Sequence, residues 1–154
     1  MKLSRVMDAF VLWPKHGIPM QNQLTSYDKE NLEGVSKIIV DNLTPDLLPK
    51  KWRKRNSITP MFGHCHTASA CLQKVFGTKN IKLYRAKDDE EIWHWWCVDA
   101  NGKRIDLTAD QYYNVGRTPP YEQGEKASIL GWSYKKRVEE LLERVEKVLD
   151  KSQQ

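Results

Sequence analysis

The sequence predicts an α+β domain, with helices at both ends of the chain and strands in its middle. Apolar residues recur at helical spacing in three regions, namely residues 3–10, 32–39 and 138–149. Strand-like segments follow one another ahead of the last region, at residues 81–86, 92–98 and 103–107. Because helices and strands are grouped along the chain and do not alternate, the pattern is typical of an α+β fold.

The first predicted helices lie in the N-terminal part of the chain. The first has an apolar stripe that a proline ends, the residues being Leu3, Val6, Met7, Phe10 and Pro14. The second has Asp28 in its first turn and an apolar stripe from Leu32 to Ile39. Thr44 followed by Pro45 indicates an N-cap and a first-turn proline, which predicts a further short helical turn.

The other predicted elements surround the strands. A third helix is expected at residues 64–77, ended by Gly77. Residues 114–131 are rich in Gly and Pro and are expected to form a long loop. Ser133 can cap a final helix, whose apolar stripe consists of Val138, Leu141, Leu142, Val145, Val148 and Leu149.

The length and composition fit one globular domain. The chain has 154 residues, and we treat 1–154 as a single domain with a helical N-terminal extension, 1–60, and a core, 61–150. With 40% hydrophobic and 29% charged residues, it is not a disordered tail. No apolar run approaches the roughly 20 residues that a bilayer requires. Charged residues interrupt the apolar positions near the N-terminus, so we expect neither a membrane segment nor a secretory signal.

The positive charge is local. Lys and Arg outnumber Asp and Glu by 25 − 20, a net charge of +5. One run supplies five positive charges, so the rest of the chain is neutral on balance; these residues are Lys50, Lys51, Arg53, Lys54 and Arg55. Such a run is usually a solvated face. It can also bind nucleic acid or an acidic partner, with Trp52 available to stack on a base.

The three cysteines are expected to be free thiols. An odd number, without a secretory signal, indicates a reducing and therefore cytoplasmic compartment. Cys71 falls inside the apolar arc of its helix, and Cys97 lies on a strand face, so both are expected to pack in the core. Cys65 opens the helix, where unpaired N–H groups and the helix dipole favour a thiolate and can hold a developing oxyanion.

A thiolate nucleophile needs a base and an acceptor that orients the base. His94 is the candidate base, on a predicted strand between Trp93 and the pair Trp95-Trp96. Asp106 is the candidate acceptor, on the next strand. The chemistry that these residue types predict is attack by Cys65, proton transfer by His94 and orientation of His94 by Asp106.

The length of the turn between the two strands tests this arrangement. A three-residue loop, 100–102, would pair Trp96 with Asp106 and bring His94 and Asp106 to one face as diagonal neighbours. A two-residue Asn101-Gly102 turn would put the two side chains on opposite faces. The triad therefore requires the three-residue loop, with a left-handed glycine at its end.

The order of cysteine, histidine and acid, with the cysteine opening a helix and the others on strands, resembles papain-like and NlpC-type cysteine peptidases. The chain more closely resembles small bacterial and phage proteins of the YunG type, over about residues 60–140. The segments that carry the resemblance are Gly63-His64-Cys65, His94-Trp95-Trp96 and Ile105-Asp106-Leu107-Thr108 followed by Gln111.

The resemblance implies a papain-like (NlpC-type) core, in which the cysteine helix packs on a small antiparallel sheet, and a reaction without a cofactor. It assigns the catalytic roles to Cys65, His94 and Asp106. In these proteins glutamine often precedes the cysteine; here His64 does, and a neutral imidazole can also donate a hydrogen bond to an oxyanion. Gln111 is a second candidate donor, and also a candidate for plain structural packing.

Simpler interpretations stay open for several of these residues. At most two of the three tryptophans Trp93, Trp95 and Trp96 can share a sheet face, because side chains alternate along a strand. At most two therefore form a groove wall, and at least one is expected to pack in the core. The His and Cys residues supply zinc ligand types, but no C-x-x-C or H-x-x-x-H pair occurs, so we expect no metal site.

Two functions follow from this reading. The first is a cysteine-dependent hydrolase or acyltransferase that acts on an amide or isopeptide bond of a protein or peptide through a thioester, as a peptidase, amidase or deamidase. The second is a binding protein without activity, which holds a protein or nucleic acid through the tryptophan groove and the basic run.

Overall fold

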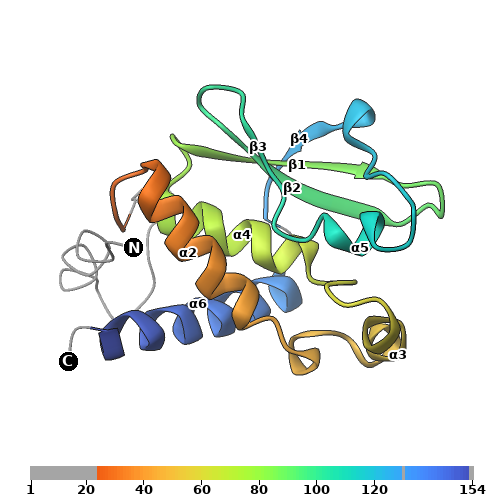
Figure 1. Cartoon of the computed structure of the whole chain (residues 1–154), viewed down its shortest axis with the longest axis horizontal. Helices are drawn as coiled ribbons and strands as arrows, with labels where there is room; N and C mark the ends of the chain where they lie inside the picture. Colours follow the sequence, from red (N-terminus) through yellow and green to blue (C-terminus); the bar gives the residue numbers. More distant parts are fainter. Residues whose placement is uncertain (1–23, 130, 153–154) are drawn as a thin grey trace.

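The structure, a computed structural model, describes residues 24–129 and 131–152 and has an α+β architecture (Figure 1). Five α-helices and two short 3-10 helices accompany four strands in the described residues. The helices are α2 (Lys29–Asp41), η1 (Pro45–Leu47), α3 (Lys50–Ile58), α4 (Cys65–Phe76), α5 (Asp110–Tyr113), η2 (Tyr121–Gln123) and α6 (Trp132–Ser152). The strands are β1 (Ile81–Lys87), β2 (Trp93–Asp99), β3 (Arg104–Ile105) and β4 (Glu125–Ala127).

The strands form one antiparallel sheet in the order β3-β2-β1-β4. The sheet lies over a layer of helices, with α4 packed between the sheet and α6 and with α2 against both helices (Figure 1). Side chains from the sheet, α2, α4 and α6 form one hydrophobic core. The predicted α+β class is confirmed, and α2 belongs to the same core as the elements that follow it.

Most of the predicted helices are present. Asp28 is the N-cap of α2, and its carboxylate accepts a hydrogen bond from the Asn31 backbone N–H at 2.8 Å. Thr44 is the N-cap position of η1, followed by a first-turn proline as predicted. α4 ends before Gly77, which has a φ of 86°. The helix predicted over residues 3–10 lies outside the described residues.

Three elements were not predicted. The basic run 50–55 is helical and forms most of α3, which buries none of its residues, so it lacks the apolar stripe by which a helix is recognised. The loop predicted at 114–131 contains η2 and the short strand β4, which pairs with β1 through Leu83 and Ala127. The strand β4 has only three residues and lies in a segment rich in Gly and Pro, so it shows no alternation of apolar and polar residues by which a strand is recognised.

The final helix, α6, is the longest of those described. It begins at Trp132, so Ser133 lies inside its first turn and is not its cap. Its buried residues follow the predicted stripe: Val138, Leu141, Leu142, Val145 and Leu149. Among the helices in the described part of the chain, none combines the length and apolar character that crossing a membrane requires.

The hairpin between β2 and β3 has the register on which the predicted site depends. Cys97 pairs with Ile105 and Val98 with Arg104, a register that puts Trp96 opposite Asp106. The Asp99 N–H donates to the Lys103 carbonyl at 2.9 Å, which closes a three-residue loop. The last loop residue, Gly102, has a φ of 82°. The predicted three-residue loop is confirmed.

Candidate active site

Cys65 is the first residue of α4, packed against the sheet. Its side chain is largely buried, with 8% of the residue exposed, and its Sγ lies 3.8 Å from the Trp93 carbonyl oxygen. At this end of a helix the first backbone N–H groups have no partner within the helix, and the helix dipole is positive. The position therefore suits a thiolate and an oxyanion formed beside it.

His94 and Asp106 are directly bonded. Nε2 of His94 donates to Oδ2 of Asp106 across 2.6 Å, as the hairpin register predicts for two side chains on one face. His94 is fully buried, at 0% exposed, and the Asp106 side chain is buried as well. The other ring nitrogen, Nδ1, has no hydrogen-bond partner of ordinary geometry among the described residues and remains available to the Cys65 thiol.

The charge of His94 is set by opposing effects. Burial by itself lowers the pKa of the ring, because it penalises the imidazolium. The interactions with Asp106 and with the Cys65 thiol outweigh burial and raise the pKa to about 9. At neutral pH the arrangement therefore favours an imidazolium held between the Asp106 carboxylate and the Cys65 sulfur.

Further groups hold the Asp106 carboxylate. The Tyr121 hydroxyl donates to Oδ2 at 2.7 Å, the same oxygen that accepts from His94. The Thr108 backbone N–H donates to Oδ1 at 3.1 Å. Sequence reasoning missed Tyr121, because η2 lies in the Gly- and Pro-rich segment, where no pattern indicates which side chain turns back to the sheet.

A second chain of contacts supports the His94 ring from the side. The ring of Tyr112, on α5, packs edge-on against it with centroids 4.8 Å apart. The Tyr112 hydroxyl donates to Asp88 Oδ2 at 2.7 Å, and Asp88 Oδ1 accepts the N–H groups of Glu90 and Ile92. Asp88 thus joins the β1–β2 turn to the aromatic support of His94.

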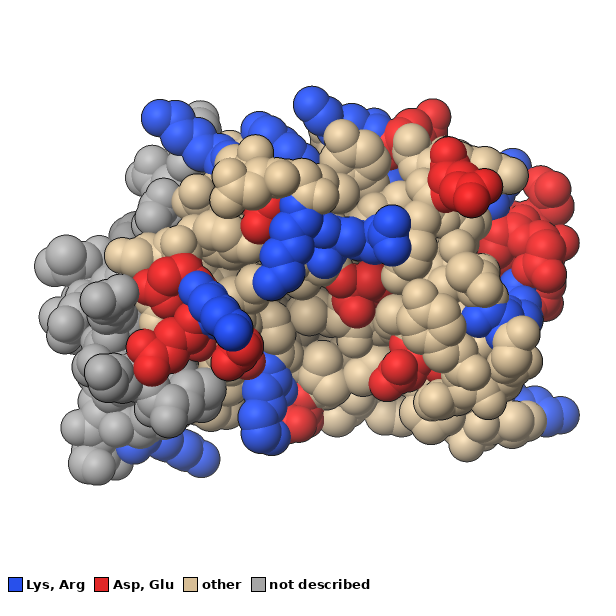
Figure 2. Space-filling model, turned by 45° about the horizontal axis from the view of Figure 1, so that its top comes forward, with Lys and Arg blue, Asp and Glu red and all other residues tan. Residues whose placement is uncertain are grey.

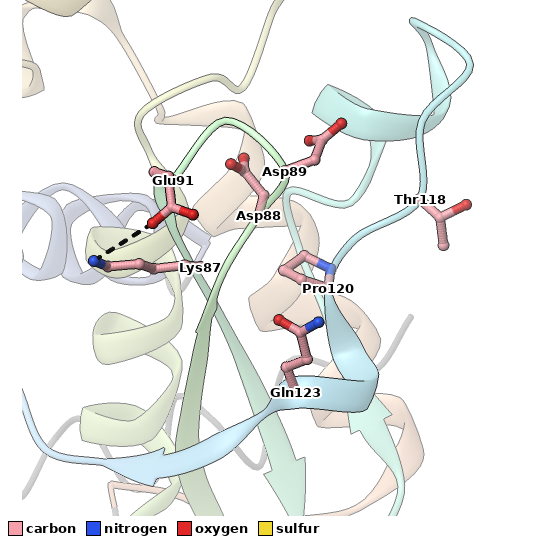
Figure 3. Close-up of a pocket in the computed structure, with 7 residues that line it drawn as sticks. All are labelled: Lys87, Asp88, Asp89, Glu91, Thr118, Pro120 and Gln123. Atoms are coloured by element: carbon pink, nitrogen blue, oxygen red, sulfur yellow. Dashed lines mark ion pairs between the residues drawn. The ribbon is translucent and has the colours of Figure 1, made fainter.

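The β1–β2 turn is acidic, and acidic side chains gather at that end of the molecule (Figure 2). Arg117 forms ion pairs with three of these carboxylates, those of Asp88, Asp89 and Glu90. A hollow of about 470 Å³ lies between the turn and residues 118–123, of which Thr118, Pro120 and Gln123 line it (Figure 3). Since Arg117 already neutralises part of this charge, we assign the cluster a structural role.

The three tryptophans of β2 divide between two environments. Trp93 and Trp95 line a cleft of about 280 Å³ beside Cys65. Trp96 is buried, stacks against the His94 ring at 5.8 Å and meets Tyr121 edge-on at 5.1 Å. One tryptophan therefore packs as scaffold for the histidine, while two form a wall of the cleft.

The two candidate oxyanion donors have different positions. Gln111 lines the cleft, but its amide nitrogen donates to the carbonyl and hydroxyl oxygens of Thr108, at 3.1 and 3.0 Å. His64 is the N-cap residue of α4, is buried, and is not among the residues that line the cleft. Burial lowers the pKa of His64 to about 4, so its ring is neutral at pH 7.

The basic run on α3 is partly engaged within the protein. Arg55 forms an ion pair with Glu90 at 2.6 Å, and Arg53 Nε donates to the carbonyl oxygens of Pro45 and Leu48. The remaining cations of the run are exposed, namely Lys50, Lys51 and Lys54. Lys51 lies over the Trp52 ring at 4.9 Å, so that ring is partly occupied.

The other cysteines are buried. Cys71 is 0% and Cys97 1% exposed, and Cys97 Sγ donates to the Ser69 carbonyl oxygen. All three cysteines are free thiols. Within residues 24–129 and 131–152, no cluster of three or more His, Cys, Asp or Glu residues is arranged to hold a metal ion.

Comparison with known proteins identifies the family of this chain. The sequence model of the YunG protein family matches residues 35–150, about three quarters of the 154 residues. No curated protein and no solved structure matches the chain. The match spans α4 with Cys65 and the hairpin with His94 and Asp106, and begins within α2. The chain belongs to the YunG family.

Proposed function

We propose that this protein is a cysteine-dependent hydrolase or acyltransferase that acts on an amide or isopeptide bond through a thioester, on a core related to that of papain-like and NlpC-type peptidases. The observation that carries the proposal is the buried His94–Asp106 bond of 2.6 Å, with Cys65 among the groups that raise the pKa of His94. A cysteine at a helix start, a histidine and an acid on neighbouring strands provide the groups that acyl transfer needs.

In the resting site the Cys65 proton resides on His94, and in the first half of the reaction the resulting thiolate, paired with the imidazolium, attacks the carbonyl carbon of the substrate through Sγ. A C–S bond forms while the carbonyl π electrons move to oxygen, giving a tetrahedral oxyanion. Backbone N–H groups of the first turn of α4 are suited to stabilise this charge. As the oxyanion collapses, the C–N bond breaks, His94 gives its proton to the leaving amine and a thioester remains.

In the second half, water or an amine attacks the thioester and His94 accepts the proton of the nucleophile. The C–S bond breaks and Cys65 leaves as a thiolate. Attack by water on an acyl group from a peptide gives hydrolysis, and on an acyl group from a glutamine side chain it gives deamidation. Attack by an amine gives transfer. Asp106, supported by Tyr121 and Thr108, holds the His94 ring in position through both halves.

A specific observation supports a second candidate, a binding protein that holds nucleic acid or an acidic protein. The helix α3 presents three exposed lysines that form no ion pair within the described part of the chain, namely Lys50, Lys51 and Lys54. They flank Trp52, which lines the cleft. A charge-driven binder loses affinity steeply as salt rises. Retention of a fluorescent oligonucleotide at low salt, lost in the triple Lys→Ala variant, would favour this candidate.

The test of the proposal is the rate at which iodoacetamide alkylates each cysteine, followed by peptide mass spectrometry over a pH series. Buried Cys71 and Cys97 are internal controls in every sample. We expect rapid alkylation of Cys65 near pH 6, slowed about tenfold or more in His94→Gln. Without the imidazolium, a smaller fraction of the Cys65 thiol is ionised, and the thiolate is the form that reacts. Slow alkylation with a midpoint near the free-thiol value of about 8.5, unchanged in His94→Gln, would contradict it.

A further inference from the structure

We propose that the cleft beside Cys65 binds a large apolar side chain, preferably aromatic, in the acyl part of a peptide substrate; this inference rests on the proposed function. The cleft has a volume of about 280 Å³ and includes Cys65 itself in its wall. A side chain seated there therefore lies next to the carbonyl that the thiol attacks. The rings in its wall come from α3 and the segment after it, β2, α5 and α6: Trp52, Phe62, Trp93, Trp95, Tyr112 and Tyr134.

The lining offers little to a charged ligand. Glu91 is the one Asp, Glu, Lys or Arg among the lining residues, and its exposed carboxylate already pairs with Lys87 at 3.8 Å. His66, between Trp95 and Tyr134 at ring distances of 4.6 and 5.2 Å, is buried, which lowers its pKa to about 4 and leaves it neutral at pH 7. Apart from the reactive Cys65 sulfur, the interior of the cleft therefore carries no charged side chain at pH 7.

Two polar side chains of the cleft already donate to other partners. The Gln111 amide nitrogen donates to Thr108, and the Tyr112 hydroxyl donates to Asp88. An acidic side chain entering the cleft would lose its hydration without receiving these hydrogen bonds, which is costly. An acidic residue is therefore disfavoured as the occupant.

A cationic occupant is disfavoured by the cations already placed on the tryptophans. The Arg85 guanidinium lies over the Trp93 ring at 4.2 Å and over the Trp95 ring at 5.4 Å. Lys87 also lies near the Trp93 ring, at 5.5 Å. Neither cation lines the cleft, but both lie close to its tryptophan wall and repel a further cation there. A neutral ring or a large aliphatic group gains from burial against the aromatic walls and from edge-to-face contacts.

The inference is tested with short peptidyl vinyl sulfones that differ in one residue, at either of the two positions before the reactive group. The residue is Phe, Leu, Lys or Asp, all other positions being Ala. Intact-mass spectrometry measures the rate at which each probe forms a thioether with Cys65. At one of the two positions we expect the Phe and Leu probes to react about tenfold or more faster than the Lys and Asp probes.

Two variants separate the cleft from the chemistry. Tyr134→Ala removes a ring from the wall and, because this tyrosine is 39% exposed, leaves the fold intact. It should slow the Phe probe severalfold and leave alkylation by iodoacetamide unchanged. Ile58→Ala, at an exposed apolar residue outside the cleft, is the matched control and should change neither rate.

The outcomes distinguish this inference from the proposed function. If the Lys or Asp probes label Cys65 as fast as the Phe and Leu probes, or faster, at both positions, the inferred preference of the cleft for an apolar side chain is wrong. If alkylation of Cys65 still depends on His94 in that case, the proposed function is unaffected. If no probe labels Cys65 and iodoacetamide reacts independently of His94, the proposed function fails and the inference falls with it.

Discussion

Replacing Asp106 with asparagine tests how the fold holds a positive charge on His94. In the folded protein the pKa of His94 is raised from 6.5 to about 9, although burial opposes the charge. At 1.36 kcal/mol for each pH unit, this difference of about 2.5 corresponds to about 3 kcal/mol in favour of the imidazolium. Asp106 is the partner that accepts the 2.6 Å hydrogen bond, so its carboxylate supplies a large part of this free energy.

In Asp106→Asn the negative charge is lost while the burial of the ring remains. We therefore expect the pKa of His94 to fall by about two or more, to a value below about 7. The assay is an NMR titration of protein labelled in its histidine rings, with the His94 signal assigned by its absence from His94→Gln. Asp110→Asn, which changes an exposed carboxylate on α5, is the control and should leave the titration as in the wild type.

The same variant has a consequence for stability. Because the pKa of His94 is raised in the folded state, its contribution to the free energy of unfolding is fully present below about pH 6.5 and is lost as pH rises through about 9. Urea unfolding should show this loss in the wild type and much less of it in Asp106→Asn. A His94 that still titrates near 9 in Asp106→Asn, or near 6.5 in the wild type, would refute the reasoning.

Three further predictions concern the surroundings of the site. Burial lowers the pKa of both His64 and His66 to about 4. The free energy of unfolding should therefore fall as pH falls from 6.5 towards 4, by up to about 3 kcal/mol for each histidine. The difference in this free energy between pH 5 and pH 7, measured by urea unfolding, should be smaller in His64→Gln than in the wild type. Tyr121→Phe removes one hydrogen-bond donor from the Asp106 carboxylate, which holds the proposed catalytic histidine, so alkylation of Cys65 should slow about two- to tenfold with little change in thermal stability; an unchanged rate would argue against a positioning role for Tyr121. Gly124→Ala would bring a methyl group within 2.5 Å of an indole carbon, so we expect a loss of about 1–3 kcal/mol in the free energy of unfolding, whereas Gly131→Ala, which meets open space, should cost little.

Local sequence signals predicted much of the frame of the site. The end of the helix at Gly77 and the apolar arc of α4 put Cys65 at a helix start. Strand alternation reduced the register of His94 and Asp106 to a choice between a two-residue and a three-residue loop; the triad required the three-residue loop, and the structure has it. These features depend on residues that are near neighbours in sequence, or on the alternation of side chains along a strand, and both can be read without knowing the rest of the fold.

The supports of the site depend on long-range packing and were not predicted. Tyr121 reaches Asp106 because the chain returns to the edge of the sheet, where β4 pairs with β1. No local sequence pattern predicts this pairing. Tyr112 meets His94 because a one-turn helix is held by Asp88, which lies 24 residues earlier in the chain. Contacts of this kind are set by how several elements pack together, so the sequence of any one element does not contain them.

The central claim, that Cys65 forms an acyl intermediate with the help of His94, is tested most directly by trapping that intermediate. The protein is mixed with p-nitrophenyl acetate near pH 7, quenched rapidly in acid and measured by intact-mass and peptide mass spectrometry. Our account predicts a burst of nitrophenol release and one acetyl group on Cys65, absent in Cys65→Ser and formed about tenfold or more slowly in His94→Gln. Acetylation confined to lysines, or acetylation of Cys65 at the same rate in His94→Gln, would contradict it.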